Sequence, residues 1–105
     1  MSEAVDIVNL YVPKGQEIVV TKGKVRQAQG SYKTQNEPVD TQIPLAVLVN
    51  GATASASEIV SGSLQDLDRA VVIGSRTFGK GLVQTIRPLP YNGKLKVTNS
   101  KYYIP

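Results

Sequence analysis

The sequence of 105 residues contains no cysteine and no histidine. Without cysteine the chain forms no disulfide, no zinc–thiolate site and no thiol nucleophile. Without histidine it cannot build a serine–histidine catalytic pair, and most transition-metal sites lose their usual ligand. We expect neither a metal nor another cofactor, and any catalysis must rely on hydroxyl, amine, amide and carboxylate groups.

Long apolar segments are also missing, since the longest uninterrupted run is Leu45 to Val49. This run is too short for a membrane span or a secretory signal peptide, so no insertion into a membrane is expected. A hydrophobic content of 41% favours a globular chain. Its length suits one small domain or part of a larger one. The sequence becomes helical almost at once and ends at Pro105 within a strand-like run, so both ends look cut.

The net charge of +4 is modest, and five of the twelve cations lie in the first third of the chain. They are Lys14, Lys22, Lys24, Arg26 and Lys33. A basic hairpin of this kind could contact nucleic acid or an anionic surface. Only Tyr32 is nearby to stack on a base, however, and no nucleic-acid motif is present. We interpret the cations as a solvated face and expect no nucleic-acid partner.

Hydrophobic periodicity predicts a short helix followed by two strands in the first third. Ala4, Ile7, Val8 and Tyr11 recur at helical spacing, and Pro13 ends the helix. Residues 17–22 and 24–28 resemble two strands around Gly23, with partner and register undetermined. Residues 34–42 are polar and form a predicted loop.

The remaining two thirds predict a β-α-β unit and a hairpin. Residues 43–49 are apolar and β-branched, as in a strand covered on both faces, and residues 70–73 resemble a second buried strand. Between them, residues 55–67 predict a helix whose packed stripe comprises Ile59, Val60, Ser63, Leu64 and Leu67. A right-handed crossover makes the two strands parallel. Residues 82–87 and 94–104 then pair as a hairpin with Asn92-Gly93 at its tip. The fold class is therefore α/β, with a βαβ crossover plus β-hairpins.

Ser55 lies where the first buried strand turns into the helix, and it has two interpretations. Ser55-Ala-Ser-Glu58 fits the capping box, in which serine and glutamate side chains satisfy free backbone N–H groups. The turn is also lined by small residues and lies at the carboxyl end of a parallel strand, where open sheets bind ligands. N–H groups at the helix start would stabilise an oxyanion there. A serine here has the position of a nucleophile but needs a base.

Lys80 is the candidate base, and two other interpretations compete with it. Gly74 to Lys80 matches most of a phosphate-binding loop, but residue 81 is glycine where serine or threonine would hold magnesium. The second alternative is a solvated lysine in a surface turn. A free lysine is protonated at neutral pH, so a base role requires burial, here beside Phe78, that favours the uncharged amine. Gln84 points to the same side of an extended chain and could orient the amine without adding charge.

Three motifs in order resemble the C-terminal processing peptidases, also called tail-specific proteases. They are residues 49–66, which contain the run Ala54-Ser55-Ala56-Ser57-Glu58, then residues 69–74, then residues 77–84 with Thr77-Phe-Gly-Lys80. The match is strong from about Ile43 to the end and weaker before it. In that family the first serine of the run is the nucleophile, which implies Ser55 rather than Ser57. The lysine base follows 25 positions later and its glutamine partner four beyond that, which implies Lys80 and Gln84.

The resemblance also implies a Clp-protease/crotonase-like core, of which residues 1–105 would be a fragment without its PDZ domain. One oxyanion donor would be the N–H of Ala56, and the other would come from a Gly-Gly turn upstream of Met1. Losing one such donor costs on the order of 100- to 1000-fold in rate, so the isolated fragment is expected to be nearly inactive. Asp66 is about 16 Å along the helix from Ser55, which favours a structural role such as pairing with Arg69. The setting implied is periplasmic or otherwise extracytoplasmic.

Two functions from different classes follow from these residues. The first is a serine endopeptidase with a Ser/Lys dyad that cleaves unfolded or tail-exposed proteins near their C-termini. The second is a domain on the same scaffold that binds peptide tails without cutting them. The nucleotide-binding loop remains as a third, weaker alternative.

Overall fold

Each of two helices is followed by three strands in the computed structural model, which describes residues 2–23, 30–88 and 94–105. For residues 83–88 and 94–100 it describes the backbone alone. In order they are α1 (Ser2–Asn9), β1 (Glu17–Lys22), β2 (Gly30–Lys33), β3 (Ala46–Val49), α2 (Ala56–Asp66), β4 (Val71–Gly74), β5 (Leu82–Pro88) and β6 (Lys94–Tyr103). The α/β class expected from the sequence is confirmed.

The hydrophobic core lies where α1, β1 and α2 meet. It consists of Ala4, Val5, Val8, Val12, Ile18, Val19, Ile59 and Leu64. Burying each of the larger side chains contributes about 1.5–3 kcal/mol. Both helices supply this core from one face, which confirms the stripe predicted for α2. In α1 the prediction holds for Ala4 and Val8 but is wrong for Ile7, which is 48% exposed, while Val5 is buried in its place. The first helix ends at Asn9, and the next two residues continue as a tightened turn with Leu10 N–H bonded to Ile7 (3.2 Å).

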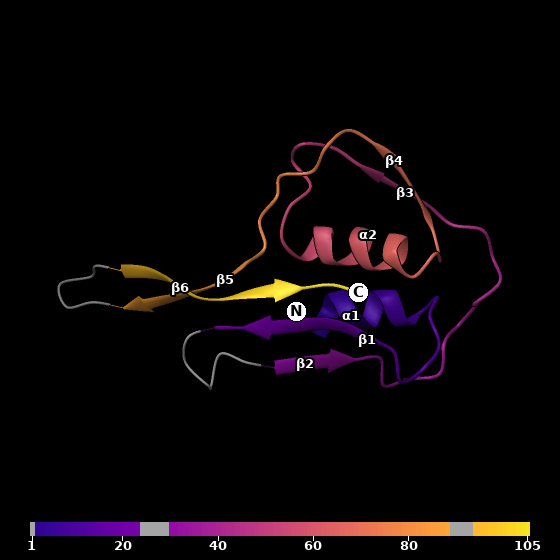
Figure 1. Ribbon diagram of the computed structural model, residues 1–105, viewed down its shortest axis with the longest axis horizontal. Helices are drawn as coiled ribbons and strands as arrows, with labels where there is room; N and C mark the ends of the chain where they lie inside the picture. Colours follow the sequence, from indigo (N-terminus) through magenta and orange to yellow (C-terminus); the bar gives the residue numbers. More distant parts are fainter. Residues whose placement is uncertain (1, 24–29, 89–93) are drawn as a thin grey trace.

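Strands β3 and β4 pair in parallel on the side of α2 opposite to α1 (Figure 1). The predicted βαβ crossover is thereby confirmed. The first strand is shorter than predicted because the N–H groups of Gln42 and Ile43 donate to the Asp40 carboxylate, which places Ile43 in a turn.

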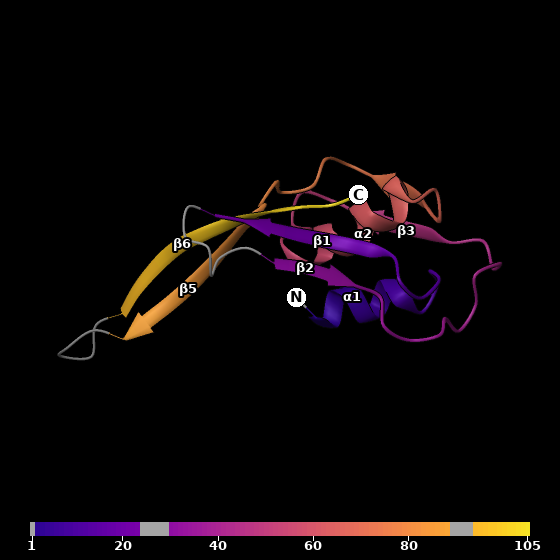
Figure 2. The same ribbon diagram turned by 60° about the horizontal axis from the view of Figure 1, so that its bottom comes forward.

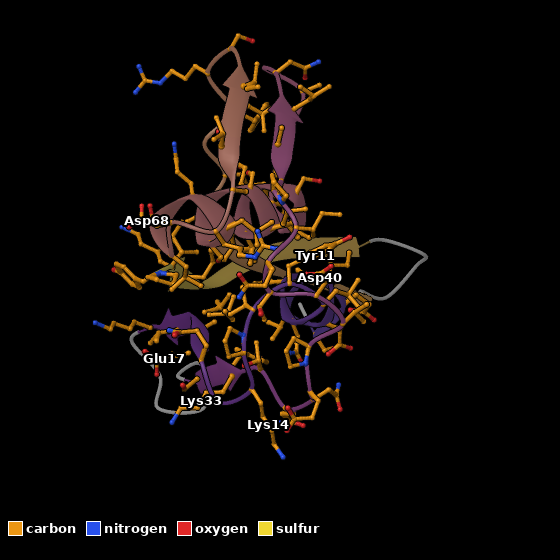
Figure 3. The ribbon with its side chains drawn as sticks, turned by 90° about the vertical axis from the view of Figure 1, so that its right-hand side faces the viewer. Tyr11, Lys14, Glu17, Lys33, Asp40 and Asp68 are labelled. Atoms are coloured by element: carbon orange, nitrogen blue, oxygen red, sulfur yellow. The ribbon has the colours of Figure 1, made fainter. Side chains whose placement is uncertain are left out.

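The expectation that these two strands are covered on both faces is wrong for the described chain. Leu48 is 79% exposed, Val71 64% and Ile73 50%. Helix α2 covers one face of the pair, while no element of the described residues covers the other. Figure 3 shows β3 and β4 as the two strands that project beyond α2.

The other four strands form an antiparallel sheet in the order β2-β1-β6-β5. Pairing from Leu82–Lys101 to Pro88–Lys94 confirms the predicted hairpin, which extends away from the body and gives the molecule a longest dimension of 53 Å (Figures 1 and 2). The last three residues of β6 pair with β1, which carries Tyr102 back to the core.

Two predictions touch residues outside the described ranges. The predicted strand 24–28 and the predicted hairpin tip at Asn92-Gly93 both lie there. The partner of β1 on that side is β2, which the sequence did not predict as a strand. Neither helix of the described residues approaches the length and hydropathy that crossing a bilayer requires.

Candidate active site

Ser55 has an unusual backbone conformation for a residue that precedes a helix. Its φ is 55° and its ψ is −120°, whereas an ordinary N-cap residue lies in the β region. These angles are those of the first central residue of a type II′ turn, a position usually occupied by glycine. A serine held there carries strain of about 1–3 kcal/mol, a feature that concentrates at functional sites. The backbone conformation of Ser55 therefore differs from that of an ordinary capping serine.

The turn that leads to Ser55 is fixed by its own side chains. The Asn50 side-chain oxygen accepts the N–H of Ala52 (2.8 Å), and the Thr53 hydroxyl oxygen accepts the N–H of Asn50 (3.0 Å). The Thr53 carbonyl then accepts the N–H of Phe78 (2.8 Å), which joins this turn to the segment that carries Lys80.

Glu58 connects the two predicted catalytic segments. Its Oε1 accepts the backbone N–H of Ser55 (3.0 Å) and that of Lys80 (2.8 Å). Its Oε2 accepts the Thr77 hydroxyl (2.8 Å) and the N–H of Gly79 (2.8 Å). The bond to Ser55 is the glutamate half of the capping box that the sequence predicted. The other three bonds bring the start of α2 and residues 77–80 together.

The same four bonds set the ionisation of Glu58. Partial burial disfavours the charged carboxylate, but the hydrogen bonds from Thr77, Lys80, Gly79 and Ser55 outweigh burial and hold the Glu58 pKa below 4.5. Glu58 is therefore a carboxylate at neutral pH, and a carboxylate accepts all four donors at once.

Tyr102 of β6 holds the segment that carries Lys80 through two further hydrogen bonds. Its hydroxyl donates to the carbonyl oxygen of Lys80, and its backbone N–H donates to the carbonyl of Gly81 (3.1 Å). Burial raises the pKa of the Tyr102 phenol, a hydrogen bond with the Ser55 side chain lowers it, and the negative charge of Glu58 raises it. The net pKa lies above 10, so the phenol is neutral at physiological pH.

Lys80 is half-buried and borders an open pocket of about 280 Å³. The pocket is lined by Glu58, Gly79, Lys80, Gly81, Tyr102 and Ile104. Gly79 has a φ of 90°, which a residue with a side chain rarely adopts. The segment after Lys80 continues as strand β5 rather than as the helix that a phosphate-binding loop requires. The nucleotide-binding alternative is therefore wrong.

The remaining predicted site residues are placed as follows. The N–H of Ala56, at the start of α2, has no acceptor within the described part of the chain, as an oxyanion donor requires. Gln84 lies in β5 opposite Thr98, just after a register shift between Val83 and Gln84.

Asp66 is exposed at the far end of α2. Within the described residues, Arg69 does not pair with it. The guanidinium donates from Nε to the Tyr11 carbonyl (2.7 Å) and from Nη2 to the Asp40 carbonyl (3.2 Å), two residues that lie close together in Figure 3. The suggested ion pair between Asp66 and Arg69 is therefore wrong, because backbone carbonyls hold the arginine instead.

The sequence alone did not identify Tyr102 as a site residue. For Glu58 it predicted only the capping bond to Ser55. The pattern Ser55-x-x-Glu58 signals a cap, but nothing in it shows that Thr77, Gly79 and Lys80 are further donors. Tyr102 gives no sequence signal, since it is one of two adjacent tyrosines in a strand. Groups of histidine, cysteine, aspartate or glutamate large enough to hold a metal are absent from the described residues.

Comparisons with known proteins place this geometry in a family. The sequence profile of peptidase family S41 matches residues 1–105. The carboxy-terminal-processing protease of Bartonella bacilliformis is 43% identical over 105 residues, which are 100% of this chain and 24% of that protein. Carboxyl-terminal-processing peptidase 1, chloroplastic, of Arabidopsis thaliana is 39% identical over 96% of this chain and 20% of its own length.

Solved structures agree with the sequence comparisons. The photosystem II D1 C-terminal processing protease superposes with a TM-score of 0.82 at 36% identity, over 98% of this chain and 26% of that one. An S41 protease from Bacteroides fragilis, named as putative, has a TM-score of 0.80 at 18% identity over 96% of this chain and 29% of its own. The chain spans about a quarter of the length of the curated relatives it matches.

Proposed function

Because the chain belongs to peptidase family S41, we propose that the full-length protein is a serine endopeptidase with Ser55 as nucleophile and Lys80 as general base. The observation that carries this proposal is the Glu58 carboxylate, whose single Oε1 accepts the backbone N–H groups of both residues. The two nitrogens can be no farther apart than the sum of these two bonds. The backbones of two residues 25 positions apart in the sequence thus lie close together, which supports the proposal.

The reaction follows from the groups present. Uncharged Lys80 takes the proton of the Ser55 hydroxyl as its oxygen attacks the scissile carbonyl carbon. The resulting oxyanion accepts the N–H of Ala56. The lysine then gives its proton to the leaving amine as the peptide bond breaks, which leaves an acyl ester on Ser55. Water, deprotonated by Lys80, cleaves the ester and restores both groups. Gln84 orients the amine without adding a charge that would favour its protonated form.

We further propose that the substrates are unfolded or tail-exposed proteins, cut near their C-termini in an extracytoplasmic compartment. Relatives are named as carboxyl-terminal-processing proteases, one of them chloroplastic and one acting on photosystem II D1. Selection of the tail would fall to a PDZ domain in the longer protein. Neighbouring strands would bind the substrate backbone as an added β-strand.

The test compares Ser55→Ala and Lys80→Ala with the unaltered full-length protein on an unfolded protein substrate. Ser57→Ala is the matched control, because Ser57 is an exposed serine in the same helical turn. Both site variants should lose cleavage by at least about 1000-fold with the fold retained, while the control stays near normal. Equal cleavage by all four proteins would refute the dyad. Tail binding with no cleavage by the unaltered protein would instead favour a binding domain.

A further inference from the structure

The backbone polar groups of Lys80 are both occupied by side chains. The Lys80 N–H is bonded to Glu58, which also accepts the N–H of Ser55. The Lys80 carbonyl accepts the hydroxyl of Tyr102. Two side chains from different elements, α2 and β6, therefore hold the Lys80 backbone.

The direction of each bond follows from chemistry. A carbonyl oxygen can only accept, so the phenol proton of Tyr102 points at Lys80. The bond therefore fixes the phenol hydroxyl against the peptide from which the Lys80 side chain projects.

Backbone pairing fixes where Tyr102 lies. Its N–H donates to the carbonyl of Gly81 (3.1 Å), and in β6 it is paired with Thr21 of β1. Tyr102 therefore binds the consecutive carbonyls of Lys80 and Gly81 from one residue. Its ring packs against the hydrophobic core, which limits the positions its hydroxyl can take.

We propose that Tyr102 is a positioning residue of the Ser55–Lys80 site, whose phenol hydroxyl holds the Lys80 backbone in place for proton transfer. This inference rests on the proposed function. It assigns to β6 a part in positioning the base that the three sequence motifs do not contain. The bond from Tyr102 aligns the base indirectly, through the peptide from which the lysine side chain projects.

Tyr102→Phe in the full-length protein removes the hydroxyl and keeps the ring. Tyr103→Phe is the matched control, because the neighbouring phenol is 48% exposed and its ring lies 4.9 Å from the Lys22 ammonium. We expect Tyr102→Phe to lower kcat about tenfold, the typical effect of losing one aligned hydrogen bond, with KM within twofold of normal. The rate at which a fluorophosphonate probe acylates Ser55 should fall by a similar factor. The control should change neither rate.

Active-site titration separates positioning from folding. A normal kcat per titrated site and a normal probe rate in Tyr102→Phe would overturn the inference, even if the melting temperature fell. Should Tyr102→Phe fail to fold, replacement of Tyr102 by a ring-fluorinated tyrosine keeps its shape and acidifies the phenol. The kcat should then fall as that phenol ionises, and a kcat equal to wild type throughout would overturn the inference.

A different result would refute the proposed Ser55–Lys80 dyad than would refute the role of Tyr102. If Ser55→Ala retains cleavage, the dyad is wrong whatever Tyr102→Phe does. If Ser55→Ala and Lys80→Ala are inactive while Tyr102→Phe is fully active, the dyad stands and only the role of Tyr102 is lost.

Discussion

At the scale of single residues, the site depends on a serine in a conformation that glycine prefers. The positive φ of 55° at Ser55 brings its Cβ close to its own backbone. The penalty is intrinsic to any residue with a Cβ, so alanine and serine share it. Strain of this kind persists only where surrounding bonds fix the backbone, and the bond from Ser55 N–H to Glu58 is one of them.

This strain predicts different stabilities for two substitutions that both remove the hydroxyl. Ser55→Gly should be about 1 kcal/mol more stable than Ser55→Ala, because relief of strain exceeds the extra unfolded-state entropy of glycine. Urea denaturation of the two full-length variants measures the difference. Equal midpoints, or a more stable alanine variant, would show that the conformation carries no strain.

Glu58 gives a second prediction at this scale. In Glu58→Gln the amide NH₂ replaces one acceptor oxygen and faces donors, so stability should fall by about 2 kcal/mol or more. Because the folded pKa of Glu58 lies below 4.5, the wild-type carboxylate contributes stability above pH 4.5. That contribution is lost as pH falls from 4.5 through the folded pKa.

Glu58→Gln has no carboxylate to protonate at this position. The variant should therefore not show the part of the acid-induced loss of stability that comes from Glu58. Thermal melts between about pH 3 and 7 provide the measurement, with Glu37→Gln, an exposed loop glutamate, as the control. An identical pH dependence in wild type and Glu58→Gln would contradict the prediction.

At the scale of elements, β3 and β4 must approach closely for the turns that follow them to meet. Gly74, at the end of β4, has a φ of 138°, and a Cβ there would lie 1.9 Å from the Val49 carbonyl oxygen. Only glycine fits this junction. The next residue, Ser75, donates its backbone N–H to the Val49 carbonyl (3.2 Å), and the segment that leads to Lys80 begins there.

Gly74→Ala should therefore destabilise the protein by about 3 kcal/mol or more, through backbone strain and a collision with main-chain atoms. Gly51→Ala is the control in the facing turn, because its added Cβ would meet nothing nearer than the Arg76 carbonyl at 3.9 Å. Chemical denaturation should separate the two variants clearly. A Gly74→Ala protein as stable as Gly51→Ala would refute the proposed close packing.

At the scale of the whole molecule, the described residues contain the proposed nucleophile, base and one proposed oxyanion donor (Ser55, Lys80 and Ala56) on a scaffold with an uncovered apolar face. The second donor is expected from a part of the longer protein outside these 105 residues. We therefore predict that the 105-residue chain, produced alone, cleaves an unfolded substrate at least 100-fold more slowly than the full-length protein. Parallel assays at equal concentration of folded protein measure this ratio. Comparable rates would mean that the described residues form a complete oxyanion site.

The sequence by itself determined the local features of this protein. The parallel strands, the helix between them, and the turns at Ser55 and Lys80 follow from β-branched runs, helical spacing and glycines that act within a few residues. The capping bond of Glu58 could also be predicted from the sequence, because its partner, Ser55, is only three positions away.

Only the tertiary structure decided what joins these pieces. The bonds from Gly79 and Lys80 to Glu58, and the bond from the Tyr102 hydroxyl to Lys80, each span more than twenty residues. The exposed face of β3 and β4 was mispredicted for a related reason, since an apolar run shows what a strand could bury but not what is present to cover it. Contacts of this range depend on how the sheet and α2 pack, and no local pattern of residues encodes that packing.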